Sequence, residues 1–204
     1  MALPTDSHSQ IVTGNISAPE VPPHWTYFLC LEEDIVRLSR WIEFAEANFG
    51  CYSIEIARLL MAACAEVDVV AKLVCKSIDP KSKANGIGEY QETIVAAFPS
   101  LPLGTASIPR HGIRLRPWEN WDRPKSSPGW WTAYNKVKHH RTEHFPKASL
   151  QHLLNATAGL LILLTLLHRG KLEALNPPTQ LFRPEAFLTR FYTGKILFSM
   201  EAQG

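Results

Sequence analysis

The strongest constraint on the fold is an almost uninterrupted apolar run from Ala156 to Leu167. It lies inside a longer helical pattern, from about Lys147 to Glu173 or Leu175, in which leucines cover most of the circumference. A helix that is apolar on nearly every face has to be surrounded, and this run is shorter than the roughly 20 residues that cross a bilayer. The pattern therefore predicts the central helix of a bundle and no membrane-spanning segment.

Other segments with helical periodicity precede this central helix. Residues 25 to 49 and 53 to 78 each carry an apolar stripe with charged residues mostly elsewhere, and a shorter helix is expected at 89 to 98. Ser53 is positioned to cap the second of these helices. Together with a further helix in the stretch Pro128–Arg141, they predict an all-α fold, a bundle of four main helices.

Residues 105 to 127 differ from the helical segments around them. Apolar residues alternate there with Arg110, Arg114 and Arg116, and prolines and tryptophans follow. Alternation over so few residues is typical of a hairpin or an extended flap. The sequence therefore predicts a small β-like flap inserted before the helix of Pro128–Arg141.

The remaining segments complete the expected domain organisation. Residues 1–22 are rich in Ser, Thr, Pro and Gly without sustained periodicity, which predicts a flexible N-terminal arm. Residues 23–204 are expected to form a single helical domain. The tail after Pro177-Pro178 is apolar and is expected to pack across the bundle as short irregular pieces, with a terminal strand at 195 to 199.

Composition narrows the functional classes. The 46% hydrophobic and 20% charged residues are ordinary for a globular protein, and the four cysteines lack the short paired spacing of a zinc or disulfide framework. The first residues lack the basic and apolar regions of a secretion signal, so we expect a cytoplasmic protein. The net charge of +2 implies no particular partner, but residues 110 to 141 hold eight Lys/Arg against two acids. This uneven distribution directs attention to that region.

The basic region combines cations with aromatic rings. Tryptophans and a tyrosine are interleaved with the basic residues, and single-stranded RNA binding uses phosphate-pairing cations beside stacking surfaces. Five basic residues are predicted to bind RNA or another phosphate group: Arg110, Arg114, Arg116, Lys136 and Lys138. The alternative is structural, because tryptophans next to prolines often anchor a flap on a helical core.

The same region contains a short pattern of metal-binding residue types. His140, Glu143 and His144 match the H-x-x-E-H pattern, in which two histidines on one helical face bind zinc. Phe145-Pro146 follows immediately and is expected to end the helix that would hold both imidazoles. We therefore predict no metal site and place Glu143 and His144 on a solvated turn.

The pair Asn135 and His139, with three residues between them, resembles the signature of the HEPN superfamily of all-α domains. That signature is an arginine, commonly followed by a polar residue, with a histidine four to six residues further along. Asn135 matches the polar residue and His139 the histidine. Tyr134 stands where the arginine is expected, so Lys138, Arg141 or an arginine of the flap would have to supply the cation.

The resemblance implies a function as well as a fold. Many HEPN members are metal-independent ribonucleases of toxin or phage-defence systems, and others bind nucleotides or act as scaffolds. For this chain it implies that His139, or its neighbour His140, moves the proton of the 2′-hydroxyl or of the leaving oxygen, supported by Asn135 and Arg141. It implies no cofactor, a homodimer that supplies a second imidazole, and a protein partner such as an antitoxin or another defence component.

Glu66 is the acidic residue that most needs an explanation. It falls within or at the edge of the apolar stripe of the second predicted helix, where a carboxylate is costly unless it is paired. Two partners are open: a residue of a neighbouring helix, in an ordinary ion pair at the edge of the core, or Arg141 or a histidine of the motif. In the second case Glu66 would support the site.

A non-catalytic function is the competing interpretation. Trp130, Trp131 and Tyr134 would then be core anchors, and the basic cluster would dock an acidic protein or a phosphate group. Asn135 would cap or cross-link helices, and His139 would bind Glu66 or a backbone carbonyl. Exposed imidazoles in a basic groove favour nucleic-acid chemistry, whereas enclosed imidazoles favour the structural alternative.

Overall fold

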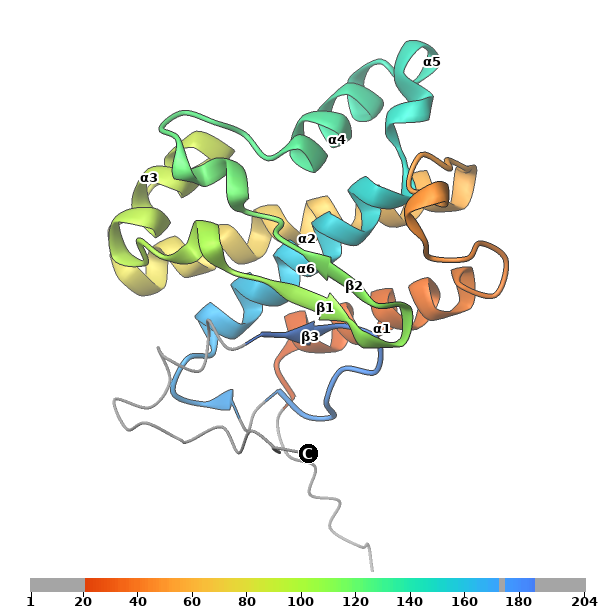
Figure 1. Ribbon diagram of the computed structural model, residues 1–204. Coiled ribbons are helices and arrows are strands. Elements are labelled where there is room, and N and C mark those ends of the chain that lie inside the picture. The colour runs from red at the N-terminus through yellow and green to blue at the C-terminus, as the bar shows by residue number, and fades with distance from the viewer. Residues whose placement is uncertain (1–20, 173–174, 186–204) are drawn as a thin grey trace, which may run out of the picture.

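The computed structural model describes residues 21–172 and 175–185, which are mostly helical with one small antiparallel sheet (Figure 1). This confirms the predicted all-α bundle with a small β flap. The helices are α1 (Pro23–Leu38), α2 (Ile54–Ile78), α3 (Ile87–Ala97), α4 (Gly129–His139), α5 (Arg141–His144) and α6 (Leu150–Leu167). The strands are β1 (Ala106–Ile108), β2 (Ile113–Leu115) and β3 (Arg183–Pro184). Residues 1–20 of the predicted arm at 1–22, and the predicted strand at 195–199, lie outside the described residues.

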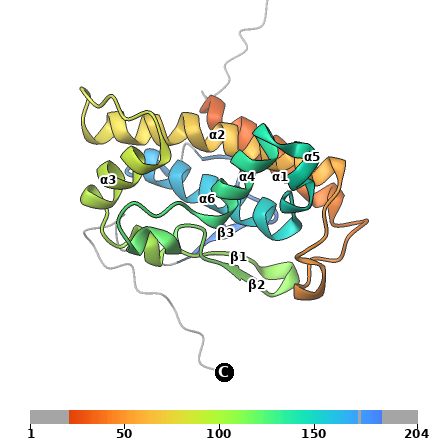
Figure 2. The same ribbon diagram turned by 90° about the horizontal axis from the view of Figure 1, so that it is seen from above.

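Helix α6 is the central element, as the apolar run predicted. Fourteen of its 18 residues are buried. Its most extensive contact is with α2, and Figure 2 shows α6 between α2 and the three-stranded sheet. By length and composition alone α6 is also a candidate membrane span, but most of it is covered by the rest of the fold.

The ends of α6 differ from the predicted bounds. Ser149 caps the N-terminus, because its Oγ accepts the backbone N–H of His152, and the residues before it form a 3₁₀ turn at Phe145–Lys147. Beyond the C-terminus, Gly170 adopts a left-handed φ of 90°, at which the chain turns away. The helix predicted from 147 to 173 or 175 was therefore too long at both ends.

Helix α1 also ends earlier than predicted, at Leu38 instead of Phe49. Ser39 Oγ donates to the carbonyl of Val36 at 2.8 Å, and the chain then turns. The turn buries Phe44 against His111 at the tip of the hairpin, with ring centroids 5.0 Å apart. A tertiary contact that periodicity does not reveal therefore ends this helix.

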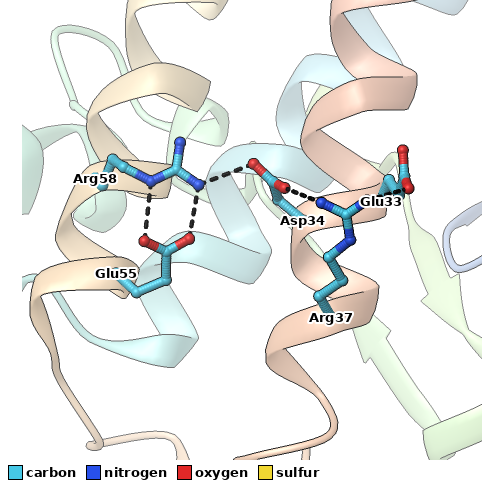
Figure 3. A network of polar contacts seen from close by, with 5 residues as sticks. All are labelled: Glu33, Asp34, Arg37, Glu55 and Arg58. Carbon is cyan, nitrogen blue, oxygen red and sulfur yellow. Dashed lines mark hydrogen bonds and ion pairs between the residues drawn. The ribbon is translucent and has the colours of Figure 1, made fainter.

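Helix α2 begins where the sequence predicted, with Ser53 Oγ accepting the N–H of Ile56. A chain of ion pairs links it to α1, as Figure 3 shows: Arg58 donates to Glu55 and, across the helix pair, to Asp34 at 2.8 Å. Arg37 of α1 continues the chain on the other side of Asp34. Such partly exposed pairs contribute about 1 kcal/mol or less each, so they orient α1 against α2 more than they stabilise it.

The flap is a hairpin, as predicted, but it belongs to a three-stranded sheet. Strand β1 pairs antiparallel with β2, Ala106 opposite Leu115, and on its other edge with β3, Ala106 opposite Pro184. The strand β3 was not predicted. It places the described part of the tail beside the flap, and Leu181 and Phe182 just before it are buried.

Three tryptophans connect the flap and α4 to α6. Trp118 donates from Nε1 to the carbonyl of Gly159 at 3.3 Å, and Trp130 donates to the carbonyl of Pro117 at 2.8 Å. The ring of Trp118 contacts those of Trp121 and Trp130, with centroids 4.2 and 5.1 Å apart. Gly159 leaves the space on α6 that these rings occupy, so the close approach depends on the missing side chain.

Glu32 of α1 binds the backbone of residues 180–182 in the described part of the tail. Its carboxylate is buried and accepts three backbone N–H groups, those of Gln180, Leu181 and Phe182, each at 2.9 Å. A buried carboxylate is stable only when it is well paired, and here backbone donors supply the pairing. The three bonds hold the chain in the position from which it enters β3.

We expect Glu32→Ala to destabilise the protein by about 3 kcal/mol, because three backbone N–H groups, two of them buried, lose their acceptor. Glu32→Gln keeps one side-chain oxygen and should cost about 1 kcal/mol. Chemical denaturation checks both values. The control is Glu33→Gln on the exposed side of α1, which should change stability by less than about 0.5 kcal/mol. Equal effects at positions 32 and 33 would contradict this account of the tail.

Gly159→Ala should destabilise the protein by about 1 kcal/mol. A Cβ there would lie 3.3 Å from ring carbons of Trp118 and Trp130, and overpacking costs more than the gain in helix propensity. Gly88→Ala on α3 is the matched control, since a Cβ there meets nothing within 4 Å. That variant should be neutral or slightly stabilising in thermal denaturation, and an equal loss in both variants would contradict the prediction.

Candidate functional site

The buried face of α4 is an anchor. Trp130, Trp131, Tyr134 and Val137 are buried and pack into the main core. The aromatic rings form a continuous series, with Trp131 5.9 Å from Trp130 and 5.3 Å from Tyr134 between centroids. The first half of the basic and aromatic stretch is therefore structural.

The opposite face of α4 carries the predicted chemical groups. Asn135 and His139 are four residues apart, so they lie on the same side of the helix. His139 and Lys136 are exposed and Asn135 is half-buried. Within the described residues, none of these three side chains makes a hydrogen bond or an ion pair. The structural alternative expected His139 to bind either Glu66 or a backbone carbonyl, and neither contact is present in the described chain.

The helix breaks immediately after His139. His140 has a non-helical backbone, with φ −140° and ψ 53°, and separates α4 from α5. Its ring lies 6.4 Å from that of His144, and Arg141 at the start of α5 is exposed. Lys138 lies over the ring of Tyr134, 5.4 Å from its centroid.

The zinc pattern has no suitable geometry. His140 and His144 do not share one continuous helix, because α5 begins only at Arg141. Over residues 21–172 and 175–185, no group of three His, Cys, Asp or Glu side chains is arranged to hold a metal ion.

The arginines of the flap lie apart from the histidines. Arg110 is exposed in the hairpin turn, and Arg114 forms an ion pair with Glu185 at 3.0 Å. Arg116 lines a depression beside α6 and Trp130. No hydrogen bond or ion pair in the described part of the chain joins these arginines to His139, and the depression that Arg116 lines does not include His139.

Glu66 pairs with His24 of α1, with Oε1 2.6 Å from Nδ1. This is the ordinary ion pair at the edge of the core that the sequence left open, and Arg141 and the motif histidines are not its partners. Its carboxylate also helps to raise the pKa of Tyr27, although burial of the phenol is the larger cause. Glu66 therefore supports the packing of α1 on α2 and not the surface of α4.

A polar depression that the sequence did not predict runs between the flap and α6. It has two adjoining parts of about 240 and 130 Å³, both lined by Arg116, Glu119, Gln151 and Asn155. Gln151, His152 and Asn155 interrupt the otherwise apolar surface of α6 near its N-terminus. These three polar residues in an otherwise apolar helix were the sequence signal from which the depression could have been predicted. They lie where α6 reaches the surface of the protein.

His152 in this depression has a defined tautomer. Its Nδ1 lies 2.8 Å from the carbonyl of Lys147, and because a carbonyl can only accept, Nδ1 carries the hydrogen. Burial lowers the pKa of His152. In the neutral ring Nε2 is therefore an acceptor.

Comparison of the chain with known protein families, curated proteins and solved structures found no match.

Stability should fall as the pH is lowered from about 7.5 to 5.5. Burial lowers the pKa of His152, and burial together with the charge of His24 lowers that of His168. The unfolded chain takes up these protons near pH 6.5, whereas the folded protein resists them, so acidification favours unfolding. A His152→Gln/His168→Gln variant should show a flatter dependence of unfolding free energy on pH. An unchanged slope in this variant would contradict the assignment of the pH dependence to His152 and His168.

Proposed function

We propose that the protein binds RNA through the outward surface of α4 and α5. The observation that supports this most directly is the pair Asn135 and His139, which faces away from the core beside Lys136 and has no partner of its own in the described chain. Arg141 extends the cationic surface past the end of the helix. Unpaired cations bind phosphates by releasing counterions, without needing a deep cavity.

We further propose that the surface cleaves RNA without a metal, as the HEPN resemblance implies. His139 would take the proton from the 2′-hydroxyl or donate one to the departing 5′-oxygen, and Lys136 or Arg141 would offset the charge on the phosphorane. Tyr134, at the position of the family's arginine, is buried and carries no cation. Cleavage uses both an acid and a base, so the proposal includes a homodimer that brings a second His139 or His140 to the site.

A second candidate is a non-catalytic docking surface for an acidic protein. The burial of the aromatic residues of α4 supports this candidate. The rings of Trp130, Trp131 and Tyr134 are packed in the core, so they are not exposed for stacking against RNA bases. The depression between the flap and α6 does not include His139 either. A partner of this kind would act as an antitoxin if it covered an active RNA-binding surface.

Binding is tested by removing two charges at a time. Lys136→Ala/Arg141→Ala should weaken binding of single-stranded RNA by about tenfold at moderate salt, and the slope of log K against log salt should fall by about 1.4. The matched control is Lys81→Ala/Lys83→Ala, two exposed lysines in the loop between α2 and α3. Fluorescence anisotropy at several salt concentrations measures both effects. Equal losses in the two variants would show that net charge is the cause and would contradict a site on α4.

Cleavage is tested on labelled RNA in the presence of a chelator. The parent protein should cleave, and His139→Ala/His140→Ala should bind RNA but lose cleavage. Cleavage that persists in this variant would exclude the two histidines. RNA binding without any cleavage would support the proposed binding function and contradict the proposed cleavage. Binding of an acidic protein without binding of RNA would favour the docking surface.

A further inference from the structure

The polar depression between the flap and α6 is bordered by two charged side chains of opposite sign. Arg116 and Glu119 line both of its parts, and both side chains are exposed. They are three residues apart in the chain, yet neither side chain makes a hydrogen bond or an ion pair within the described residues. A cation and a carboxylate therefore face the same hollow without neutralising each other.

The third charged residue of the depression has a partner. Arg114 lines the larger part, but its Nε lies 3.0 Å from a carboxylate oxygen of Glu185. No other Lys, Arg, Asp or Glu of the described chain lines either part. The charges left for a ligand are therefore the guanidinium of Arg116 and the carboxylate of Glu119.

The uncharged polar side chains add hydrogen-bond acceptors. Asn155 donates from Nδ2 to the backbone carbonyl of Gln151 at 2.9 Å, so its Oδ1 is left as an acceptor. His152 lines the smaller part, and because its Nδ1 donates to the carbonyl of Lys147, the ring nitrogen left for a ligand is the acceptor Nε2. With the carboxylate of Glu119 these make three acceptors, as many as an ammonium group has N–H donors.

We propose that this depression binds a free α-amino acid. Arg116 pairs with the carboxylate of the ligand, since the planar guanidinium fork matches carboxylate geometry. Glu119 accepts from the ammonium group, together with Asn155 and His152. An amino acid carries one charge of each sign, so it complements the two unpaired groups, whereas a phosphate ester would meet the carboxylate of Glu119 with like charge.

The size and the walls of the depression suit a small apolar amino acid such as leucine. The two parts, of about 240 and 130 Å³, are each below the roughly 300 Å³ at the lower limit for drug-sized ligands. Phe49 is half-buried and lines the larger part, where it offers apolar surface to a side chain. This inference does not depend on the function proposed for α4, because Asn135 and His139 do not line the depression.

Calorimetric titration of the parent protein with L-leucine and two analogues tests whether both charges of the ligand are read. 4-Methylpentanoate lacks the ammonium group of leucine, and 3-methylbutylamine lacks its carboxylate. Each analogue should bind at least about tenfold more weakly than leucine, because one charged group of the protein is left without its partner. In ¹⁵N spectra, leucine should shift the side-chain amide peaks of Gln151 and Asn155.

Two substitutions assign each charge of the ligand to its partner. Arg116→Gln should weaken leucine binding at least about tenfold but leave the binding of 3-methylbutylamine unchanged. Glu119→Gln should weaken leucine binding equally but leave the binding of 4-methylpentanoate unchanged. Both side chains are exposed and unpaired, so thermal denaturation should show parent stability. The matched controls are Arg110→Gln in the hairpin turn and Glu92→Gln on α3, two exposed residues outside the depression, which should bind leucine like the parent.

Several results would overturn the inference. These are no binding of leucine at millimolar concentration, equal binding of leucine and its two analogues, or equal losses in the control variants. Tighter binding of ribose 5-phosphate than of leucine would assign the depression to a phosphate ester, and displacement of leucine by single-stranded RNA would assign it to RNA. The Lys136→Ala/Arg141→Ala variant should bind leucine like the parent, so failure of this inference is distinguishable from failure of the RNA proposal.

Discussion

The burial of α6 is the constraint on which the rest of the structure depends. A helix with 14 buried residues out of 18 must be covered on nearly every side, and a bundle of a few helices cannot easily do this alone. Helix α2 covers one side and the flap, α4 and the tail contribute to the others. The small sheet is therefore part of the cover of the core, and the polar residues Gln151, His152 and Asn155 occur where that cover is incomplete.

The burial of α6 also explains why α4 has one structural face and one exposed face. Trp130 and Trp131 are drawn to α6 by the burial of their large apolar area, so α4 lies with one face inward. Asn135 and His139 then face outward because they lie on the opposite side of the same helix. The exposure of the candidate chemical groups follows from the position of the tryptophans, and it does not by itself establish catalysis.

The sequence predicted the features that periodicity and capping control. The central position of α6, the Ser53 cap and the hairpin followed from local patterns. It did not predict the end of α1 at Leu38, which depends on Phe44 meeting His111, more than 60 residues away in the chain. The pairing of Glu66 with His24 was left open for the same reason.

The hold of Glu32 on the tail has a consequence for association between molecules. Strand β1 pairs with β2 on one edge and with β3 on the other, so its backbone is satisfied on both sides. Without β3 that edge would offer free N–H and C=O groups to any extended chain nearby, which is the usual route to edge-to-edge aggregation. By fixing the residues that lead into β3, one buried carboxylate on α1 also keeps this edge of β1 covered and away from strands of other molecules.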